Sequence, residues 1–153
     1  TRNEENTIIY TTGYQNATTS ATVNGVEIEA EINIMKDLSF NANYTFTELK
    51  EGTRLRLPKH KANASLGYNF SNASYMSINY QFVGSRMDTD FSTYENVKLD
   101  SFSLVDIYFS QKLIKNKLKL FASVTNLFNT DYVEIVDFTT KGRNVNIGLN
   151  INL

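Results

Sequence analysis

The C-terminal stretch, residues 143–153, alternates strictly between apolar and small polar side chains. Its apolar residues are Val145, Ile147, Leu149, Ile151 and Leu153, and only Asn or Gly stands between them. Successive side chains of a strand point to opposite faces, so this stretch has one apolar and one polar wall. Strands of soluble sandwiches usually run about five or six residues, whereas a tilted membrane-crossing strand needs roughly nine to eleven. The length of the pattern therefore favours a strand that crosses an outer membrane, with the odd-numbered residues facing lipid.

The same alternation recurs along most of the chain. It is found in residues 26–34, 38–46, 62–70, 76–82, 105–113 and 118–124. A less regular strand is expected near residues 8–13. Helical spacing of apolar residues persists nowhere, and β-branched and aromatic residues are abundant. The sequence predicts an all-β fold of about eight antiparallel strands in an up-and-down order.

The connections between these strands alternate in length. Short turns are expected at residues 36–37, 71–74 and 114–116, and longer stretches at residues 50–57, 87–100 and 129–142. Outer-membrane barrels have short periplasmic turns and longer extracellular loops. The pattern therefore predicts a transmembrane β-barrel segment whose longer loops face outward.

Composition narrows the functional class. Lysine plus arginine is 15 and aspartate plus glutamate is 16, a formal net charge of -1. That balance argues against a nucleic-acid interface, which would be strongly basic. The chain has no cysteine, which excludes disulfides and thiolate metal sites.

The two walls differ in a way that bears on the membrane. The polar wall is rich in asparagine and carries Glu27, Glu29 and Glu31 in a row. Aromatic residues stand near the ends of the apolar wall, at Phe46, Phe70 and Phe82. Aromatic residues at strand ends are typical of the girdles of membrane barrels. The alternative is a soluble sheet that buries its apolar face.

The end of the chain resembles the C-terminal signature of TonB-dependent outer-membrane receptors. The residues that carry this resemblance are Asn126, Leu127, Phe128, Asn129 and Tyr132, followed by Gly142 and Arg143. The stretches Asn24–Glu27 and Leu57–Lys61 are also similar to the family. One departure is Leu153, since the family commonly ends in phenylalanine. We expect the element at residues 126–129 to be a bulge that shapes the outer rim and does not touch substrate.

The resemblance implies a barrel of about twenty-two strands preceded by a plug domain. Residues 1–153 would be the C-terminal portion of that barrel, with the plug domain and the earlier strands absent. The chain lacks an initiator methionine and a signal segment, so we expect it to be a piece of a longer protein.

The implied function is active import of a scarce solute across the bacterial outer membrane. The resemblance favours a siderophore- or cobalamin-like chelate, with energy reaching the receptor from the TonB complex through the absent plug. The other implied partners are outer-membrane lipid and the barrel-assembly machinery, which would bind the terminal strand 143–153. No cofactor is implied.

Ligand contacts are expected in two of the longer loops. The candidates are Arg86, Asp88, Asp90, Phe91 and Tyr94 in one loop, and Tyr132, Asp137 and Phe138 in the other. Loops on a rigid scaffold commonly carry binding, and aromatic anchors beside a few polar groups suit a bulky chelate. The alternative is that both loops are hydrated rim.

The sequence predicts neither an enzyme nor a metal site. The single histidine, His60, has no serine, cysteine or second histidine arranged as a partner. The row Glu27, Glu29 and Glu31 needs no cation when it lines a wet lumen. Asp88 and Asp90 lack the glycine and distal glutamate of an EF-hand loop.

Two other functional classes remain open at this point. One is a free-standing small outer-membrane barrel with a structural or adhesive role. The other is a soluble β-sandwich that acts as a binding module and buries its apolar face. The upstream open reading frame distinguishes the first from a TonB-dependent receptor, and solubility without detergent identifies the second.

Overall fold

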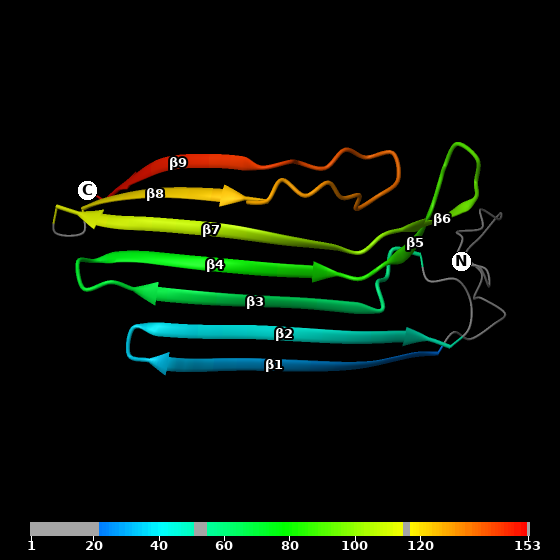
Figure 1. Ribbon diagram of the computed structural model, residues 1–153, viewed down its shortest axis with the longest axis horizontal. Coiled ribbons are helices and arrows are strands. Elements are labelled where there is room, and N and C mark those ends of the chain that lie inside the picture. The colour runs from blue at the N-terminus through cyan, green and yellow to red at the C-terminus, as the bar shows by residue number, and fades with distance from the viewer. Residues whose placement is uncertain (1–21, 51–54, 115–116, 153) are drawn as a thin grey trace, which may run out of the picture.

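The computed structural model describes residues 22–50, 55–114 and 117–152 (Figure 1). The strands are β1 (Val23–Met35), β2 (Leu38–Leu49), β3 (His60–Asn69), β4 (Ser74–Val83), β5 (Arg86–Thr89), β6 (Asn96–Leu99), β7 (Phe102–Leu113), β8 (Leu118–Thr125) and β9 (Asn144–Ile151). A 7-stranded antiparallel sheet has the order β1-β2-β3-β4-β7-β8-β9, and β5 and β6 form a separate hairpin. The described residues contain no helix long and apolar enough to cross a membrane.

The predicted all-β, antiparallel, up-and-down arrangement is confirmed. Each alternating segment from residue 26 onward corresponds to one strand of the sheet, and neighbours in sequence are neighbours in the sheet. The strand expected near residues 8–13 and the terminal Leu153 lie outside the described residues. Residues 87–100 were expected to form a loop, but the structure places the hairpin β5–β6 there.

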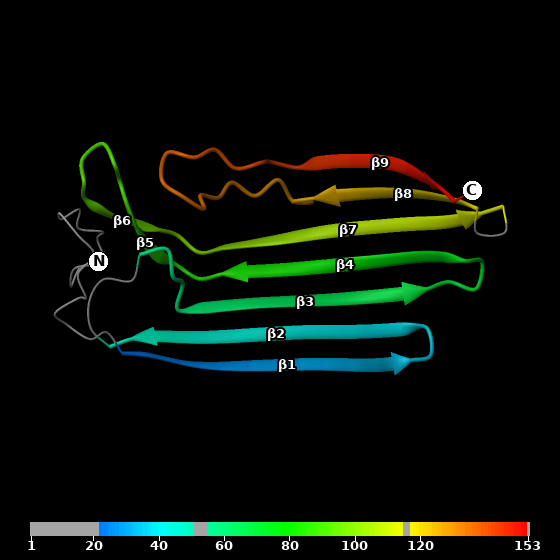
Figure 2. The ribbon, with the colours of Figure 1, turned by 180° about the vertical axis from the view of Figure 1, so that it is seen from behind.

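The register of the ladders aligns the apolar residues of all seven strands on one face. Facing pairs on this apolar wall include Val26 with Phe46, Ile78 with Ile107, and Leu120 with Leu149. Figures 1 and 2 show the sheet from opposite sides, and the described residues place no second layer on either face. Ile78 is 40% exposed and Ile147 is 83% exposed. A soluble antiparallel sheet would bury such a face against a core.

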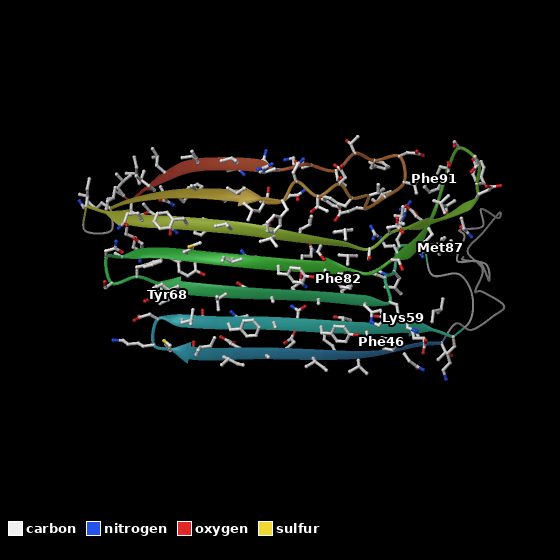
Figure 3. The ribbon with its side chains drawn as sticks, in the orientation of Figure 1. Phe46, Lys59, Tyr68, Phe82, Met87 and Phe91 are labelled. Atoms are coloured by element: carbon white, nitrogen blue, oxygen red, sulfur yellow. The ribbon has the colours of Figure 1, made fainter. Side chains whose placement is uncertain are left out.

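Short and long connections lie at opposite ends of the sheet (Figure 1). The turns after β1, β3 and β7 are short and share one end with the C-terminus. The connections after β2, β4 and β8 are longer and lie at the other end, which we call the outer end. Figure 3 shows Phe46 and Phe82 towards the outer end and Tyr68 towards the short turns. Aromatic side chains therefore flank the apolar wall at both ends, as the sequence predicts.

The polar face also holds a row of aromatic rings. The ring centroids of Tyr75 and Tyr108 are 6.2 Å apart, and those of Tyr108 and Phe121 are 6.3 Å apart. Phe121 then lies over Gly148 on β9, where an added Cβ would come within 2.4 Å of its ring. Gly148 thus allows close packing of an aromatic ring against the backbone. The polar face therefore carries large aromatic rings among its small polar side chains.

Candidate functional site

A polar trough of about 770 Å³ runs over strands β1 to β4 and β7. Its polar lining residues are Glu29, Glu31, Asn41, Asn43, Asn63, Ser65, Asn79, Gln81 and Asp106. Amides pair across strands, since Nδ2 of Asn63 donates to Oδ1 of Asn43 at 2.9 Å. In the same way the hydroxyl of Ser65 donates to Oδ1 of Asn79 at 2.8 Å. The trough therefore offers hydrogen-bonding groups and negative charge to whatever occupies it.

The glutamate row of β1 lies along this polar face. Glu27, Glu29 and Glu31 stand opposite Thr45, Asn43 and Asn41, respectively. The Thr45 hydroxyl donates to Oε1 of Glu27 at 3.5 Å. Nowhere in residues 22–50, 55–114 and 117–152 do three His, Asp or Glu side chains gather closely enough to hold a metal ion. The row is a line of solvated acceptors along the wall.

At the outer end, Asp88 of β5 is almost fully buried, with 1% of its surface exposed. One carboxylate oxygen accepts from Nε of Arg56 at 2.6 Å and from the backbone N–H of Thr89 at 2.9 Å. The other accepts from the backbone N–H of Val136 at 2.9 Å. Burial alone would raise the pKa of Asp88, but hydrogen bonds from Val136, Arg56 and Thr89 outweigh it. The pKa therefore lies below its ordinary value, and the carboxyl group stays ionised.

Arg86 makes the complementary contact two residues earlier on the same face of β5. Its Nη2 donates to the carbonyl oxygens of Val133 at 2.9 Å and Glu134 at 2.8 Å. Its guanidinium carbon lies 5.5 Å from the ring centroid of Phe102. Arg86 is only 8% exposed. Together Arg86 and Asp88 hold residues 133–136 of the β8–β9 connection against the β5–β6 hairpin, a contact that we call the loop clasp.

The turn between β5 and β6 presents aromatic side chains to solvent. Phe91 is 59% exposed and Tyr94 is 81% exposed. Asp90 holds this turn, since it accepts from the Ser92 hydroxyl at 2.6 Å and from the Ser92 N–H at 2.8 Å. Hydrogen bonds from the Ser92 hydroxyl and backbone lower the pKa of Asp90. Figure 3 shows Phe91 at the outer end, beyond the main sheet.

Three residues of the β8–β9 connection were predicted to contact the ligand, and they differ in burial. Tyr132 packs on Phe102, with ring centroids 4.6 Å apart, and burial raises the pKa of its hydroxyl. Phe138 is 67% exposed. Asp137 precedes it and has a φ of 65°. The structure thus brings Arg86, Asp88 and Tyr132 together in the packed base of the loops, and leaves Phe91, Tyr94 and Phe138 at the surface.

The residues of the C-terminal signature form a hydrogen-bonded turn where β8 ends. Asn126 is 3% exposed and has a φ of 50°. Its side chain accepts from the N–H of Thr130 at 2.8 Å and donates to the Thr130 carbonyl at 2.9 Å. Oδ1 of Asn129 accepts from the N–H of Arg143 at 2.8 Å. A bulge was expected at residues 126–129, but β8 ends at Thr125 and the structure places a turn there instead.

Gly142 has a steric reason to be glycine. An added Cβ at this position would come within 2.8 Å of Oδ1 of Asn129. The same oxygen accepts from the N–H of Arg143, so it has little freedom to move away. Asn129 and Gly142 therefore join the two ends of the β8–β9 connection, which matches a structural role for the signature.

Two contributors to the outer end were not singled out from the sequence. Arg56 completes the partners of Asp88, and the backbone of residues 133–136 supplies the rest of the clasp. A basic residue in a loop is a weak indication of such a contact in the sequence, and backbone groups give no indication at all.

His60 lies on the apolar wall, where its Nδ1 is 2.7 Å from the Tyr44 hydroxyl and its ring is 5.4 Å from that of Phe46. Its surroundings are those of an aromatic cluster at the outer end.

Comparison with known proteins gives matches along most of the chain. Residues 2–127 match the family described as TonB dependent receptor-like, beta-barrel. The vitamin B12 transporter BtuB of Vibrio cholerae is 31% identical over 127 residues, covering 80% of this chain and 20% of the transporter. The chain thus spans about a fifth of the length of the curated relatives it matches.

Solved structures match the fold. The ferric-catecholate import receptor Fiu of Escherichia coli has a TM-score of 0.72 and 19% identity, covering 86% of this chain and 21% of the receptor. The receptor FpvA of Pseudomonas aeruginosa, solved with an iron-loaded pyoverdine, also has a TM-score of 0.72, with 18% identity. That match covers 84% of this chain and 19% of FpvA.

Proposed function

Because the chain belongs to the TonB-dependent receptor-like β-barrel family, we propose that it forms part of the wall of an outer-membrane receptor that imports a scarce solute. The observation that carries this proposal is the uncovered apolar face that continues across all seven strands of the sheet. Such a face is stable against lipid, while the opposite face can line a wet lumen. The receptor would work in the bacterial outer membrane as a transporter and not as an enzyme.

The edges of the sheet favour a wall that is part of a larger barrel. Strands β1 and β9 lie at opposite edges of the sheet and are not paired with each other. Unpaired backbone groups cannot be left in hydrocarbon, so both edges need further strands. We place residues 1–153 at the C-terminal part of a barrel of about twenty-two strands. A plug domain and the earlier strands would then belong to other parts of the same protein.

The cargo that we propose is a bulky chelate of the siderophore or cobalamin type. Two observations support this class. A curated relative is a vitamin B12 transporter, and the structural neighbours include FpvA with an iron-loaded pyoverdine and the ferric-catecholate import receptor Fiu. The energy for import would come from the TonB complex, acting through the plug. The barrel-assembly machinery would bind the terminal strand 143–153.

Within this chain, the exposed aromatic residues of the outer loops are the proposed contacts for the cargo. Phe91, Tyr94 and Phe138 present rings to solvent on two connections that the loop clasp fixes to one another. Arg86, Asp88 and Tyr132 make the contacts that pack the bases of these two connections. Asp90 and Asp137 shape the turns next to them.

A triple substitution tests this assignment. Changing Phe91, Tyr94 and Phe138 together to alanine in the full-length gene product should weaken binding of a labelled chelate to whole cells by at least about tenfold. One aromatic anchor whose truncation costs about 1.4 kcal/mol is enough for that loss, and aromatic residues are enriched among the costly positions of interfaces. The matched control is Phe128→Ala, which removes another exposed ring at the outer end. Unchanged affinity with normal surface expression would leave this segment as wall and rim only.

A further inference from the structure

A small pocket lies at the outer margin of the apolar wall, between the segment before β3 and the β5–β6 hairpin. Its volume is about 200 Å³. It is lined by Leu57, Lys59, Ser85, Arg86, Met87 and Lys98. Three of these side chains are cationic and two are apolar. The residues proposed to contact the imported solute, Phe91, Tyr94 and Phe138, do not line this pocket.

Contacts of Lys59 fix the level of the pocket relative to the membrane. Its Nζ lies 5.3 Å from the ring centroid of Phe46 and 2.8 Å from Oε1 of Glu48. Phe46 stands opposite His60 on the apolar wall, among the aromatic residues at the outer end. Figure 3 shows Lys59 beside Phe46, with Met87 further towards the outer loops. The pocket therefore begins where the aromatic band ends.

The hairpin supplies the opposite side of the pocket. Met87 and Lys98 face each other in the β5–β6 ladder, so their side chains share one face of the hairpin. Lys98 is exposed and can reach a ligand with its flexible stem. Arg86 also lines the pocket, but its guanidinium points to the other face of the hairpin, where it binds the carbonyls of Val133 and Glu134. Glu48 offsets only part of the positive charge of the two lysines.

We propose that this pocket binds the anionic phosphate headgroup of an outer-leaflet lipid, with Lys59 and Lys98 as its ligands. Ammonium groups form strong charge-assisted hydrogen bonds with phosphate oxygens. Leu57 and Met87 would contact the first carbons below the headgroup. The inference rests on the proposed function in one respect, namely that the apolar wall faces lipid.

A lipid fits this pocket better than a free anion does. A soluble phosphate ion would use the cations but would leave the apolar walls of Leu57 and Met87 in water. Aromatic girdles mark the interface of a membrane barrel, and headgroups lie at that level. Lys59 lines the pocket and also lies against Phe46 of the apolar wall, so an acyl chain could continue from the pocket along the wall.

The test uses the full-length gene product in detergent and native mass spectrometry with three probes. Phosphatidic acid carries both phosphate and acyl chains, diacylglycerol carries the acyl chains alone, and inorganic phosphate carries the anion alone. We expect retention of phosphatidic acid and much weaker retention of diacylglycerol. The combined Lys59→Gln and Lys98→Gln variant should weaken retention of phosphatidic acid by about fivefold per lysine, as expected for a basic residue near an anionic membrane surface.

The matched control is the combined Lys36→Gln and Lys61→Gln variant, because Lys36 lies in a short turn and Lys61 points to the polar face. It should retain phosphatidic acid like the unaltered protein. Equal retention by both double variants would overturn the lipid site and leave the wall assignment intact. Displacement of phosphatidic acid by inorganic phosphate would also overturn it, in favour of a free-anion site. A protein that stays monodisperse without detergent and binds no lipid would overturn the proposed function itself.

Discussion

Replacing Ile78 with arginine should destabilise the folded barrel by about 2–4 kcal/mol, the cost of a cation on the lipid face near the midplane. Ile78 lies in the middle of β4, between Leu66 and Ile107 in the neighbouring ladders. It is 40% exposed on the apolar wall. The measurement is denaturant-induced unfolding of the full-length gene product in lipid vesicles.

Gln81→Arg is the control for this prediction. Gln81 lies on the same strand, but it points to the polar trough and is exposed there. A cation on a water-lined wall keeps its hydration, and the nearby carboxylates of the trough attract it. We expect its effect to stay within about 1 kcal/mol, below the range for the lipid face. Equal losses from the two substitutions would contradict the assignment of one wall to lipid and the other to water.

The second large effect is expected at the loop clasp. Asp88→Ala removes the acceptor for the backbone N–H groups of Val136 and Thr89, and each unsatisfied buried donor costs about 1–3 kcal/mol. Part of that cost should appear as local opening, because water can enter when residues 133–136 separate from the hairpin. Hydrogen exchange measures this directly, and the amide of Val136 should exchange faster while the amides of β7 stay protected.

Asp131→Ala is the matched control, since Asp131 is an exposed carboxylate of the same connection. It should leave the exchange of Val136 unchanged. Unaltered exchange at Val136 in Asp88→Ala would show that the carboxylate does not hold the connection in place.

The clasp also has a predicted dependence on pH. The folded pKa of Asp88 is lower than its ordinary value of 3.8, so the ionised form stabilises the folded loops. That contribution is fully present above the ordinary value and is lost as the pH falls through the lower folded pKa. Protection of Val136 should therefore persist at neutral and mildly acidic pH and disappear only in strong acid. Loss of protection near neutral pH would point to another titrating group.

Strand positions could be predicted from this sequence because a two-residue period is a local property of the chain. Residues 144–151 read as a strand without any knowledge of their neighbours, and the structure places β9 there. Once the strands are located, the lengths of the connections between them are known, and so is the alternation of short turns with long loops. The faces of the sheet also follow, because antiparallel pairing places like faces together once the register is fixed.

The hairpin and the clasp could not be predicted in this way. Strands β5 and β6 have 4 residues each, which is too short for a period to emerge. The partners of Arg86 are backbone carbonyls, and a backbone group leaves no mark in the sequence. The type of side chain therefore could not show that Arg86 is buried and holds the loops together, or that Phe91 is exposed to solvent.

The most direct test of the central claim is a scan with nitroxide spin labels on single cysteines at residues 145–147 and 149–151. Residues 1–153 contain no cysteine of their own. The full-length gene product would be reconstituted in lipid vesicles, and the accessibility of each label to oxygen and to a water-soluble nickel complex would be measured. Labels at Val145, Ile147, Leu149 and Ile151 should be accessible to oxygen, whereas labels at Asn146 and Asn150 should be accessible to nickel. Labels at the odd positions that are shielded from both reagents would indicate a buried protein core and would contradict a lipid-facing wall.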